Sequence, residues 1–166
     1  MRLSLLPAMI AGKLTDLTPE FLKQQGIELL MLDFDNTIIP YTTNEPTPAV
    51  AAWLETVKTS GISVCVVSNS RNDRVRIFCE KYGLDCITRA KKPFPVGIPK
   101  CLAKYGVPAA NAAMVGDQIF TDTLGGNLAG CQSILVKPIH NHNFWLKARH
   151  VLEQPFIFMA RNRRIS

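Results

Sequence analysis

Five short stretches of the chain are predominantly apolar, and turn-forming residues separate them from their surroundings. They lack the strict apolar-polar alternation of a strand with one solvent-exposed face, so they are typical of strands buried on both faces of a parallel sheet. The predicted strands cover residues 27–33, 62–67, 86–88, 112–115 and 132–136.

Helix signals lie between the predicted strands. Thr18 and Thr47 each precede a proline, and a capping hydroxyl followed by proline is a typical helix start. The predicted helices cover residues 19–25, 48–58, 73–82, 95–105 and 121–129, and a glycine follows most of their ends. Strands that alternate with helices at this spacing indicate βαβ units. The sequence therefore predicts a three-layer α/β/α, Rossmann-like fold around a parallel five-stranded sheet.

Chain length and composition fit one folding unit. With 166 residues, of which 47% are apolar, the chain can form one sizeable core. We expect a single domain over residues 1–166, with its core at about residues 27–137. The first 13 residues are rich in leucine, but they contain Pro7 and are too short to cross a bilayer. Arg2 followed by leucines leaves a targeting or interfacial role open for this end.

Charge and cysteine content restrict the partners. There are 19 Lys and Arg against 13 Asp and Glu, a formal charge of +6, which favours anionic partners such as phosphorylated metabolites, phospholipid headgroups or nucleic acid. We see no aromatic stacking platform, so nucleic acid is the least favoured of these. The five cysteines include no C-x-x-C pair, which predicts core thiols in a reducing compartment, with neither zinc nor disulfides.

Polar residues suited to one reaction follow four of the five predicted strands. Ligands of open parallel sheets bind beyond the carboxyl ends of the strands. Asp33 and Asp35 close the first strand and point the same way because they are two residues apart. Paired carboxylates at such a place require a metal, an arginine or a catalytic task. The other strand ends contribute Ser68, Asn69, Lys91, Lys92, Asp117 and Asp122.

This set of groups is suited to phosphoryl transfer. One carboxylate can attack phosphorus while a second protonates the leaving oxygen and then activates water, and Asp33 and Asp35 fit these two roles. A hard cation such as Mg²⁺ would offset their charge, with Asp117 as a further ligand. Lys92 would offset the charge of the nucleophile and the phosphate, and Ser68 with nearby backbone N–H groups would bond the equatorial phosphate oxygens. Each residue alone is also an ordinary cap, turn or solvated loop residue. Their coincidence at successive strand ends favours catalysis.

The motifs resemble those of a known superfamily. The order D-x-D-x-T, a serine after an apolar strand, a lysine, and G-D-x-x-x-x-D is similar to the haloacid dehalogenase (HAD) phosphatases over about residues 28–136. The resemblance implies a HAD-like fold, Asp33 as nucleophile and Mg²⁺ ligand, and Asp35 as general acid/base whose backbone carbonyl also binds the metal. It implies Asp117 as a metal ligand. Asp122 would bind the metal directly, act through water, or hold the loop.

The same resemblance assigns the phosphate contacts. Ser68, Asn69 and Thr37 are expected to bind or support the phosphate. Lys92 is preferred over Lys91 because the lysine before proline is the one found in the related subfamily, although the sequence leaves both open.

Substrate class follows from the absence of a cap insertion. Only about thirty residues separate Thr37 from Ser68, and the predicted helix and strand occupy them, so the open site favours a bulky substrate. The strings L-D-F-D-N-T-I-I-P-Y, V-S-N-S and G-D-Q-x-x-T-D-T-L-G-G-N look like the capless subfamily III phosphatases that include phosphatidylglycerophosphate phosphatases. This implies removal of the terminal phosphate of phosphatidylglycerophosphate in phospholipid biosynthesis. The alternatives are a phosphatase that acts on a soluble metabolite, a protein or a nucleic-acid end, and a non-catalytic binding protein.

The tail is compatible with a lipid substrate. A predicted helix from residue 143 has an apolar face, and Arg161, Arg163 and Arg164 follow it, a pattern typical of interfacial helices near anionic lipids. The alternative is that this helix packs on the sheet. We expect a cytoplasmic protein, or a peripheral one on the inner face of a membrane, and we interpret His140 and His142 as non-ligands. The apolar face consists of Phe144, Trp145, Ala148, Val151 and Leu152.

Overall fold

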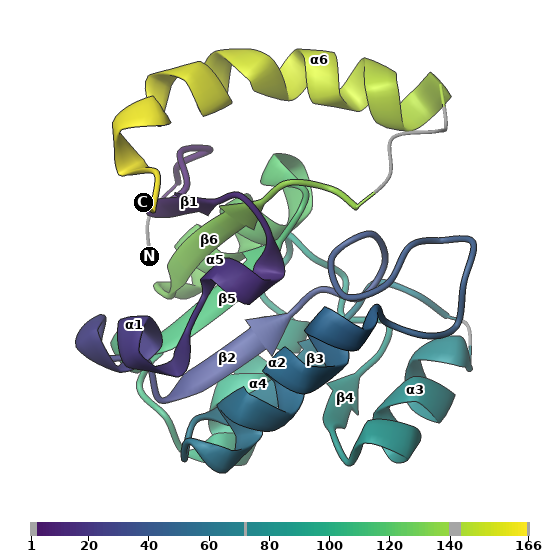
Figure 1. Cartoon of the computed structure of the whole chain (residues 1–166). Helices are drawn as coiled ribbons and strands as arrows, with labels where there is room; N and C mark the ends of the chain where they lie inside the picture. The colour runs from purple at the N-terminus through teal and green to yellow at the C-terminus, as the bar shows by residue number, and fades with distance from the viewer. Residues whose placement is uncertain (1–2, 72, 140–143, 166) are drawn as a thin grey trace.

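Within the residues that the structure describes, six parallel strands form the sheet at the centre of the molecule (Figure 1). The structure, a computed structural model, describes residues 3–71, 73–139 and 144–165, with the backbone alone for 144–151. The order across the sheet is β1-β6-β5-β2-β3-β4, and each pair of neighbours is parallel. The strands are β1 Met9–Ala11, β2 Leu29–Leu32, β3 Ser63–Val67, β4 Asp85–Ile87, β5 Ala112–Gly116 and β6 Gln132–Val136.

The parallel α/β fold is confirmed, but the predicted count of five strands is wrong. The extra strand is β1, which pairs with β6 through Met9 and Ile134. The strand has only three residues, so it is too short to give a periodic signal, and only its pairing with β6 makes it a strand. The N-terminal leucine-rich stretch therefore leads into the edge of the sheet.

The predicted helices are present with small shifts at their ends. Thr18 Oγ1 accepts the Phe21 N–H at 3.2 Å, and Thr47 Oγ1 accepts the Val50 N–H at 3.3 Å, as capping residues should. The α-helices are α1 Pro19–Gln24, α2 Pro48–Thr59, α3 Arg74–Tyr82, α4 Gly97–Tyr105, α5 Leu124–Ala129 and α6 Phe144–Met159. Short 3₁₀ turns cover Leu14–Asp16, Ala109–Asn111 and Arg161–Arg163, and a π-helical turn, η3, covers Ile119–Thr123.

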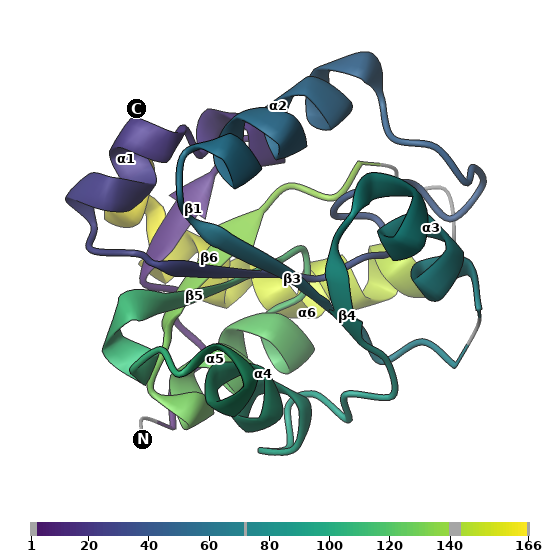
Figure 2. The same cartoon turned by 90° about the horizontal axis from the view of Figure 1, so that it is seen from below.

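The helices cover both faces of the sheet. Seen from below, α1, α2 and α3 lie on one face and α4 and α5 on the other (Figure 2). Alternate residues of β2 serve the two cores: Leu30 and Leu32 face α2, and Leu29 and Met31 face α4. Both faces are buried, which explains why the sequence of this strand is continuously apolar.

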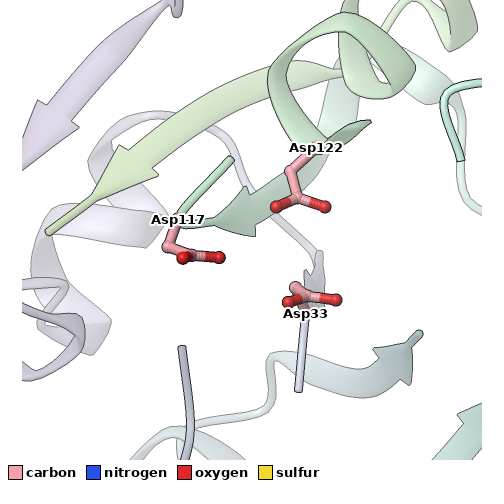
Figure 3. A group of neighbouring side chains, drawn as sticks. All are labelled: Asp33, Asp117 and Asp122. Atoms are coloured by element: carbon pink, nitrogen blue, oxygen red, sulfur yellow. The ribbon is translucent and has the colours of Figure 1, made fainter. Parts of the chain in front are cut away.

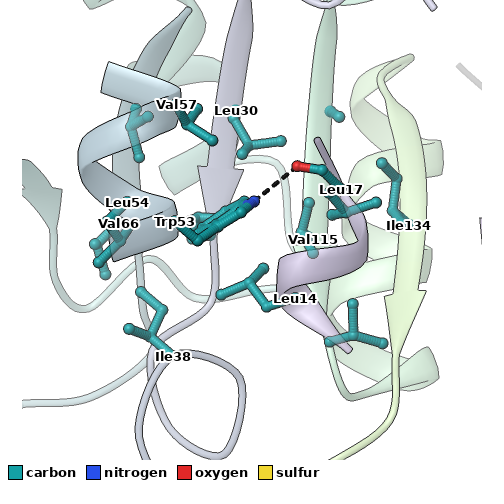
Figure 4. Close-up of a cluster of buried hydrophobic side chains, with 14 of the residues drawn as sticks. Leu14, Leu17, Leu30, Ile38, Trp53, Leu54, Val57, Val66, Val115 and Ile134 are labelled. Atoms are coloured by element: carbon teal, nitrogen blue, oxygen red, sulfur yellow. Dashed lines mark hydrogen bonds between the residues drawn. The ribbon is translucent and has the colours of Figure 1, made fainter. Parts of the chain in front are cut away.

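A tryptophan joins the N-terminal segment to the larger core. Trp53 of α2 packs between Leu30 and Leu14, and its ring Nε1–H donates to the carbonyl of Leu17 at 2.7 Å (Figure 4). A buried indole keeps its one donor satisfied in this way. The five cysteines are free thiols, and Cys86 is the least buried of them.

The C-terminal segment is part of the fold. Helix α6 crosses the edge of the sheet formed by β1 and β6 (Figure 1), and Ala160 is buried against Ile10 and Leu135. Beyond it, the Ile165 N–H donates to the Ile10 carbonyl at 2.8 Å. The predicted helix is confirmed, although the side chains of residues 144–151 and all of His140 and His142 lie outside the described residues. Within the described part of the chain, no helix is long and apolar enough to span a bilayer.

Candidate active site

The winding of the sheet reverses between β2 and β5. From β2 the chain runs outward through β3 to β4, then returns to β5 on the other side of β2 and continues to β6. Ligand sites of open α/β sheets lie at the carboxyl ends of such neighbouring strands. Asp33 follows β2 and Asp117 follows β5, so the two predicted residues flank this point. The Asp33 N–H donates to the Val115 carbonyl at 2.8 Å, which keeps the two strand ends together.

Three carboxylates converge at this edge (Figure 3). Oxygens of Asp33, Asp117 and Asp122 lie within 4.8 Å of one another. All three side chains belong to buried residues, with exposures of 6%, 4% and 1%. Carboxylates that are this close together and buried from solvent repel one another strongly unless a cation lies between them.

Asp122 reaches the cluster through the π-helical turn η3. Its Oδ2 accepts the Gln118 N–H at 3.1 Å, which folds the turn back onto the end of β5. Gly116 leaves the space this requires, because a Cβ there would lie 2.1 Å from Asp122 Oδ2. The G-D-x-x-x-x-D motif therefore supplies two carboxylates and also the glycine that leaves room for the second of them.

Lys92 is the lysine of the site. Its Nζ lies 2.7 Å from Asp33 Oδ1 and 2.7 Å from Asp122 Oδ1, and its side chain is 1% exposed. Lys91 is exposed to solvent, so the structure places Lys92 rather than its neighbour at the cluster. Burial works against the charge of Lys92, but the carboxylates of Asp122 and Asp33 outweigh it and raise the pKa of the ammonium.

The cluster fits a hard divalent cation. Three carboxylates and the single ammonium of Lys92 leave two negative charges. The donors are all oxygen, which is the preference of Mg²⁺. Burial raises the pKa of Asp122 to about 6, Lys92 opposes this shift, and Asp33 adds to it. A carboxyl with a pKa near 6 is ionised at neutral pH and available to a metal.

Asn69 holds the lysine in place. Its Nδ2 donates to the Lys92 carbonyl at 2.9 Å, and its Oδ1 accepts the Lys92 N–H at 2.7 Å. We predicted a phosphate contact for Asn69, and the structure adds a positioning role that the sequence did not indicate. One hydrogen of the amide remains for a phosphate oxygen.

Two hydroxyls lie at the adjacent strand ends. Ser68 is buried, and its Oγ accepts the Ser70 N–H at 3.1 Å, so its own hydrogen is left to donate. Thr37 Oγ1 is buried without a hydrogen bond to any described residue. A buried hydroxyl in this state requires a partner, and a phosphate oxygen would supply one.

Arg74 is a candidate functional residue that the sequence analysis missed. Its guanidinium donates to Asp35 Oδ1 at 2.6 Å and to the Pro40 carbonyl at 2.6 Å, and it also bonds the carbonyl of Thr43. It lies over the Phe34 ring, 5.1 Å from the centroid. Burial raises the pKa of Asp35, while the charge of Arg74 opposes the shift. An arginine at the start of a helix carries no sequence signal for such a role.

The fold and the site define a HAD-type hydrolase, and comparisons with known proteins agree. A family model described as HAD-hydrolase-like matches residues 89–140. "Probable phosphatase YqeG" of Bacillus subtilis is 34% identical over 134 residues, covering 81% of this chain and 78% of that protein. The chain belongs to the haloacid dehalogenase superfamily and is one of its phosphatases.

Solved structures share the fold at low identity. The cobalt-bound deoxy-D-mannose-octulosonate 8-phosphate phosphatase of Haemophilus influenzae has a TM-score of 0.55 at 12% identity, covering 84% of this chain and 92% of its own. The 3-deoxy-D-manno-octulosonate 8-phosphate phosphatase of Moraxella catarrhalis, in complex with magnesium, phosphate and KDO, has a TM-score of 0.51 at 14% identity. It covers 86% of this chain and 93% of its own. The first of these structures holds cobalt and the second magnesium.

Proposed function

We propose that this protein is an Mg²⁺-dependent phosphomonoesterase that works through an aspartyl-phosphate on Asp33 and that its substrate is phosphatidylglycerophosphate. The observation that carries the reaction type is the contact of Lys92 with both Asp33 and Asp122 inside a buried, three-carboxylate cluster. Asp33, Asp117 and Asp122 would hold the metal together with the Asp35 carbonyl. When bound, Mg²⁺ supplies positive charge for the phosphate oxygens and for the attacking carboxylate.

The reaction divides into two steps. Asp33 attacks phosphorus, the bond from phosphorus to the ester oxygen breaks, and Asp35 gives its proton to that oxygen as the alcohol leaves. Asp35 then takes a proton from water, whose oxygen attacks phosphorus, and the bond to Asp33 breaks to release phosphate. The raised pKa of Asp35 suits a group that holds a proton in one step and accepts one in the next.

The remaining groups stabilise charge. Lys92 lies on the Asp33 carboxylate and offsets the negative charge that collects there. The hydroxyls of Ser68 and Thr37 would donate to equatorial oxygens, which carry most of the negative charge in the transition state. We keep a phosphate-binding role for Asn69 through its remaining amide hydrogen.

Three features support a lipid substrate. The chain between β2 and β3 consists of a loop and α2, which leaves the site open to a bulky substrate. The protein has a formal charge of +6, which favours anionic surfaces. Helix α6 exposes Leu152, Phe158 and Met159, and Arg161 lies over the Phe158 ring. Peripheral association with a membrane is part of this proposal.

A soluble phosphate ester is the second candidate, because Asp117 of the site also lines a cavity of about 460 Å³. A cavity of this size admits a small polyol.

A phosphate-release panel with purified protein and Mg²⁺ tests the proposal. The substrates are phosphatidylglycerophosphate in mixed micelles, 3-deoxy-D-manno-octulosonate 8-phosphate, a nucleotide and a phosphopeptide. We expect the lipid to be hydrolysed with the highest kcat/KM. Asp33→Asn should lower activity by a factor on the order of 10³ or more. The matched control is Asp73→Asn, because Asp73 is exposed and paired only with Arg76 among the described residues.

The covalent step has its own readout. Borohydride reduction of the phosphorylated enzyme should convert residue 33 to homoserine, detectable by mass spectrometry. Near-normal turnover of Asp33→Asn would overturn the aspartyl-phosphate mechanism. Preference for the sugar phosphate would overturn the lipid assignment and leave the mechanism standing.

A further inference from the structure

A cavity of about 460 Å³ includes Asp117 in its wall, but not Asp33, Lys92 or Asp122. The carboxyl ends of β1 and β6, two residues of α6 and the C-terminal segment also line it. Figure 1 shows α6 passing over β1 and β6. We call this cavity the Asp117 pocket. Its wall includes Ile10, Leu135, Ile157, Asp117, Lys137 and Arg164.

Strand register places this pocket next to the reacting phosphate. Gly116 of β5 pairs with Leu135 of β6, so Asp117 is level with Val136, and Lys137 lies one residue further. Strands β2 and β6 are separated only by β5, which puts their ends about 10 Å apart. A substrate whose phosphate meets Asp33 therefore reaches the pocket across about 10 Å, the length of a short extended polyol chain.

The pocket carries two basic groups. Within the part of the chain that the structure describes, neither Lys137 nor Arg164 forms an ion pair with an acidic side chain. The backbone of Arg164 is fixed, because this residue bridges to Ile10 and the next N–H donates to the Ile10 carbonyl. Lys137 and Arg164 are both exposed, so their side chains are accessible to a ligand in the pocket. A guanidinium presents a fork that matches carboxylate and phosphate oxygens.

The acidic groups in the pocket wall do not prevent an anion from binding there. Asp117 belongs to the proposed metal site, where a cation would offset its charge. Asp16 turns to its own loop: its Oδ2 accepts the Lys13 N–H at 2.9 Å and lies against Gly12. Its second oxygen can accept a hydroxyl of a polyol.

We propose that the Asp117 pocket binds a second anionic group of the substrate, joined to the scissile phosphate by a short polyol and contacted by Arg164 and Lys137. This rests on the proposed function, and it adds a substrate class: esters with two anionic groups. A phosphodiester next to a glycerol phosphate and the carboxylate of a sugar-acid phosphate share this chemistry. The apolar wall of Ile10, Leu135 and Ile157 accepts the carbon atoms beyond the anion.

The test compares substrates with one and two anionic groups. Glycerol 1-phosphate has only the scissile phosphate, deacylated phosphatidylglycerophosphate adds a phosphodiester, and 3-deoxy-D-manno-octulosonate 8-phosphate adds a carboxylate. In the wild type we expect kcat/KM to favour one of the two-anion esters over glycerol 1-phosphate. In Arg164→Gln/Lys137→Gln this preference should fall about tenfold, as expected for the loss of charge-assisted hydrogen bonds. Arg161→Gln is the matched control, because it is exposed in the same tail and does not line the pocket.

Equilibrium binding separates the pocket from the reaction. Two proteins are titrated with the same two-anion ester by calorimetry: Asp33→Asn, and a variant that combines Asp33→Asn with Arg164→Gln/Lys137→Gln. The combined variant should bind the ester with a Kd about tenfold weaker. The melting temperature is recorded for each variant. Charge-dependent binding without turnover in the wild type would overturn the proposed function and support the pocket. Turnover with an unchanged preference in the double variant, or an equal loss on all three esters, would overturn the pocket. The ester that shows the effect identifies the source of the anion.

Discussion

The guanidinium of Arg74 donates to Asp35 Oδ1 at 2.6 Å and simultaneously bonds the backbone carbonyls of Pro40 and Thr43. One arginine thus fixes the proposed general acid/base and the loop that follows it. The side chain of Asp35 is 23% exposed and that of Arg74 18%, so the pair is only partly screened by solvent.

We expect Arg74→Gln to lower kcat/KM for an alkyl phosphate roughly tenfold to hundredfold, because Asp35 loses its orientation. The phenolate of an aryl phosphate can leave without taking a proton from Asp35, so the hydrolysis of an aryl phosphate should slow less. Arg74 lowers the pKa of Asp35, and its removal should raise that pKa. Since the protonated form acts first, the alkaline decline of kcat/KM should move to higher pH. Arg76→Gln on the same helix is the control, and an alkaline limb that does not move would contradict the link to Asp35.

Gly116→Ala should disable the site without unfolding the protein. Its Cβ would lie 2.1 Å from Asp122 Oδ2, so the carboxylate must leave its place beside Lys92. We expect activity and Mg²⁺ affinity to fall by at least tenfold, measured by phosphate release and titration of Mg²⁺. Gly106→Ala is the control, because it should lower stability without touching the site. Gly106 has a φ of 64°, so an alanine there costs about 1–2 kcal/mol of stability, but no atom lies within 4 Å of the new Cβ. Equal losses of activity in both variants would show that stability alone explains the effect.

Mg²⁺ affinity should depend on pH through Asp122. A metal binds the ionised carboxylate, and burial raises the pKa of this group to about 6. Below that value the proton competes with the metal, so at pH 5 the Kd for Mg²⁺ should be about tenfold weaker than at pH 7.5. Asp122→Asn should bind more weakly at pH 7.5 and lose most of this dependence. The same pH dependence in Asp122→Asn would assign it to another carboxylate.

Vesicle binding should depend on α6. Co-sedimentation with anionic vesicles should decrease as salt rises, because each basic residue near the surface contributes about 1 kcal/mol before screening. Leu152→Ser/Phe158→Ser should weaken binding further, since both side chains are about two-thirds exposed, at 66% and 65%. Ile77→Ser on α3, where Ile77 is 64% exposed, is the matched control.

At least one arginine of the C-terminal segment has a structural role. Arg163 donates to the Pro7 carbonyl at 2.7 Å, so its replacement would disturb the fold as well as any membrane contact. An interfacial role for the tail is contradicted if the wild type does not sediment at low salt.

Much of the fold could be read from the sequence, because its main determinants are local. Continuous apolar runs mark β2, β3, β5 and the second half of β6, and capping threonines define the starts of α1 and α2. Parallel strands place their carboxyl ends at one edge, so the sequence also predicted that Asp33 and Asp117 would meet. The three-residue β1 has no such local determinant and depends on β6.

The tertiary structure decided the contacts between residues far apart in the chain. Lys92 and Asp33 are 59 residues apart, and Arg74 and Asp35 are 39 apart. A lysine in a loop and an arginine at a helix start look the same in sequence whether they face solvent or a carboxylate. The resemblance favoured Lys92 over Lys91, but the contacts of Lys92 with Asp33 and Asp122, the role of Arg74 and the existence of the Asp117 pocket follow only from how the strands, loops and C-terminal segment pack together.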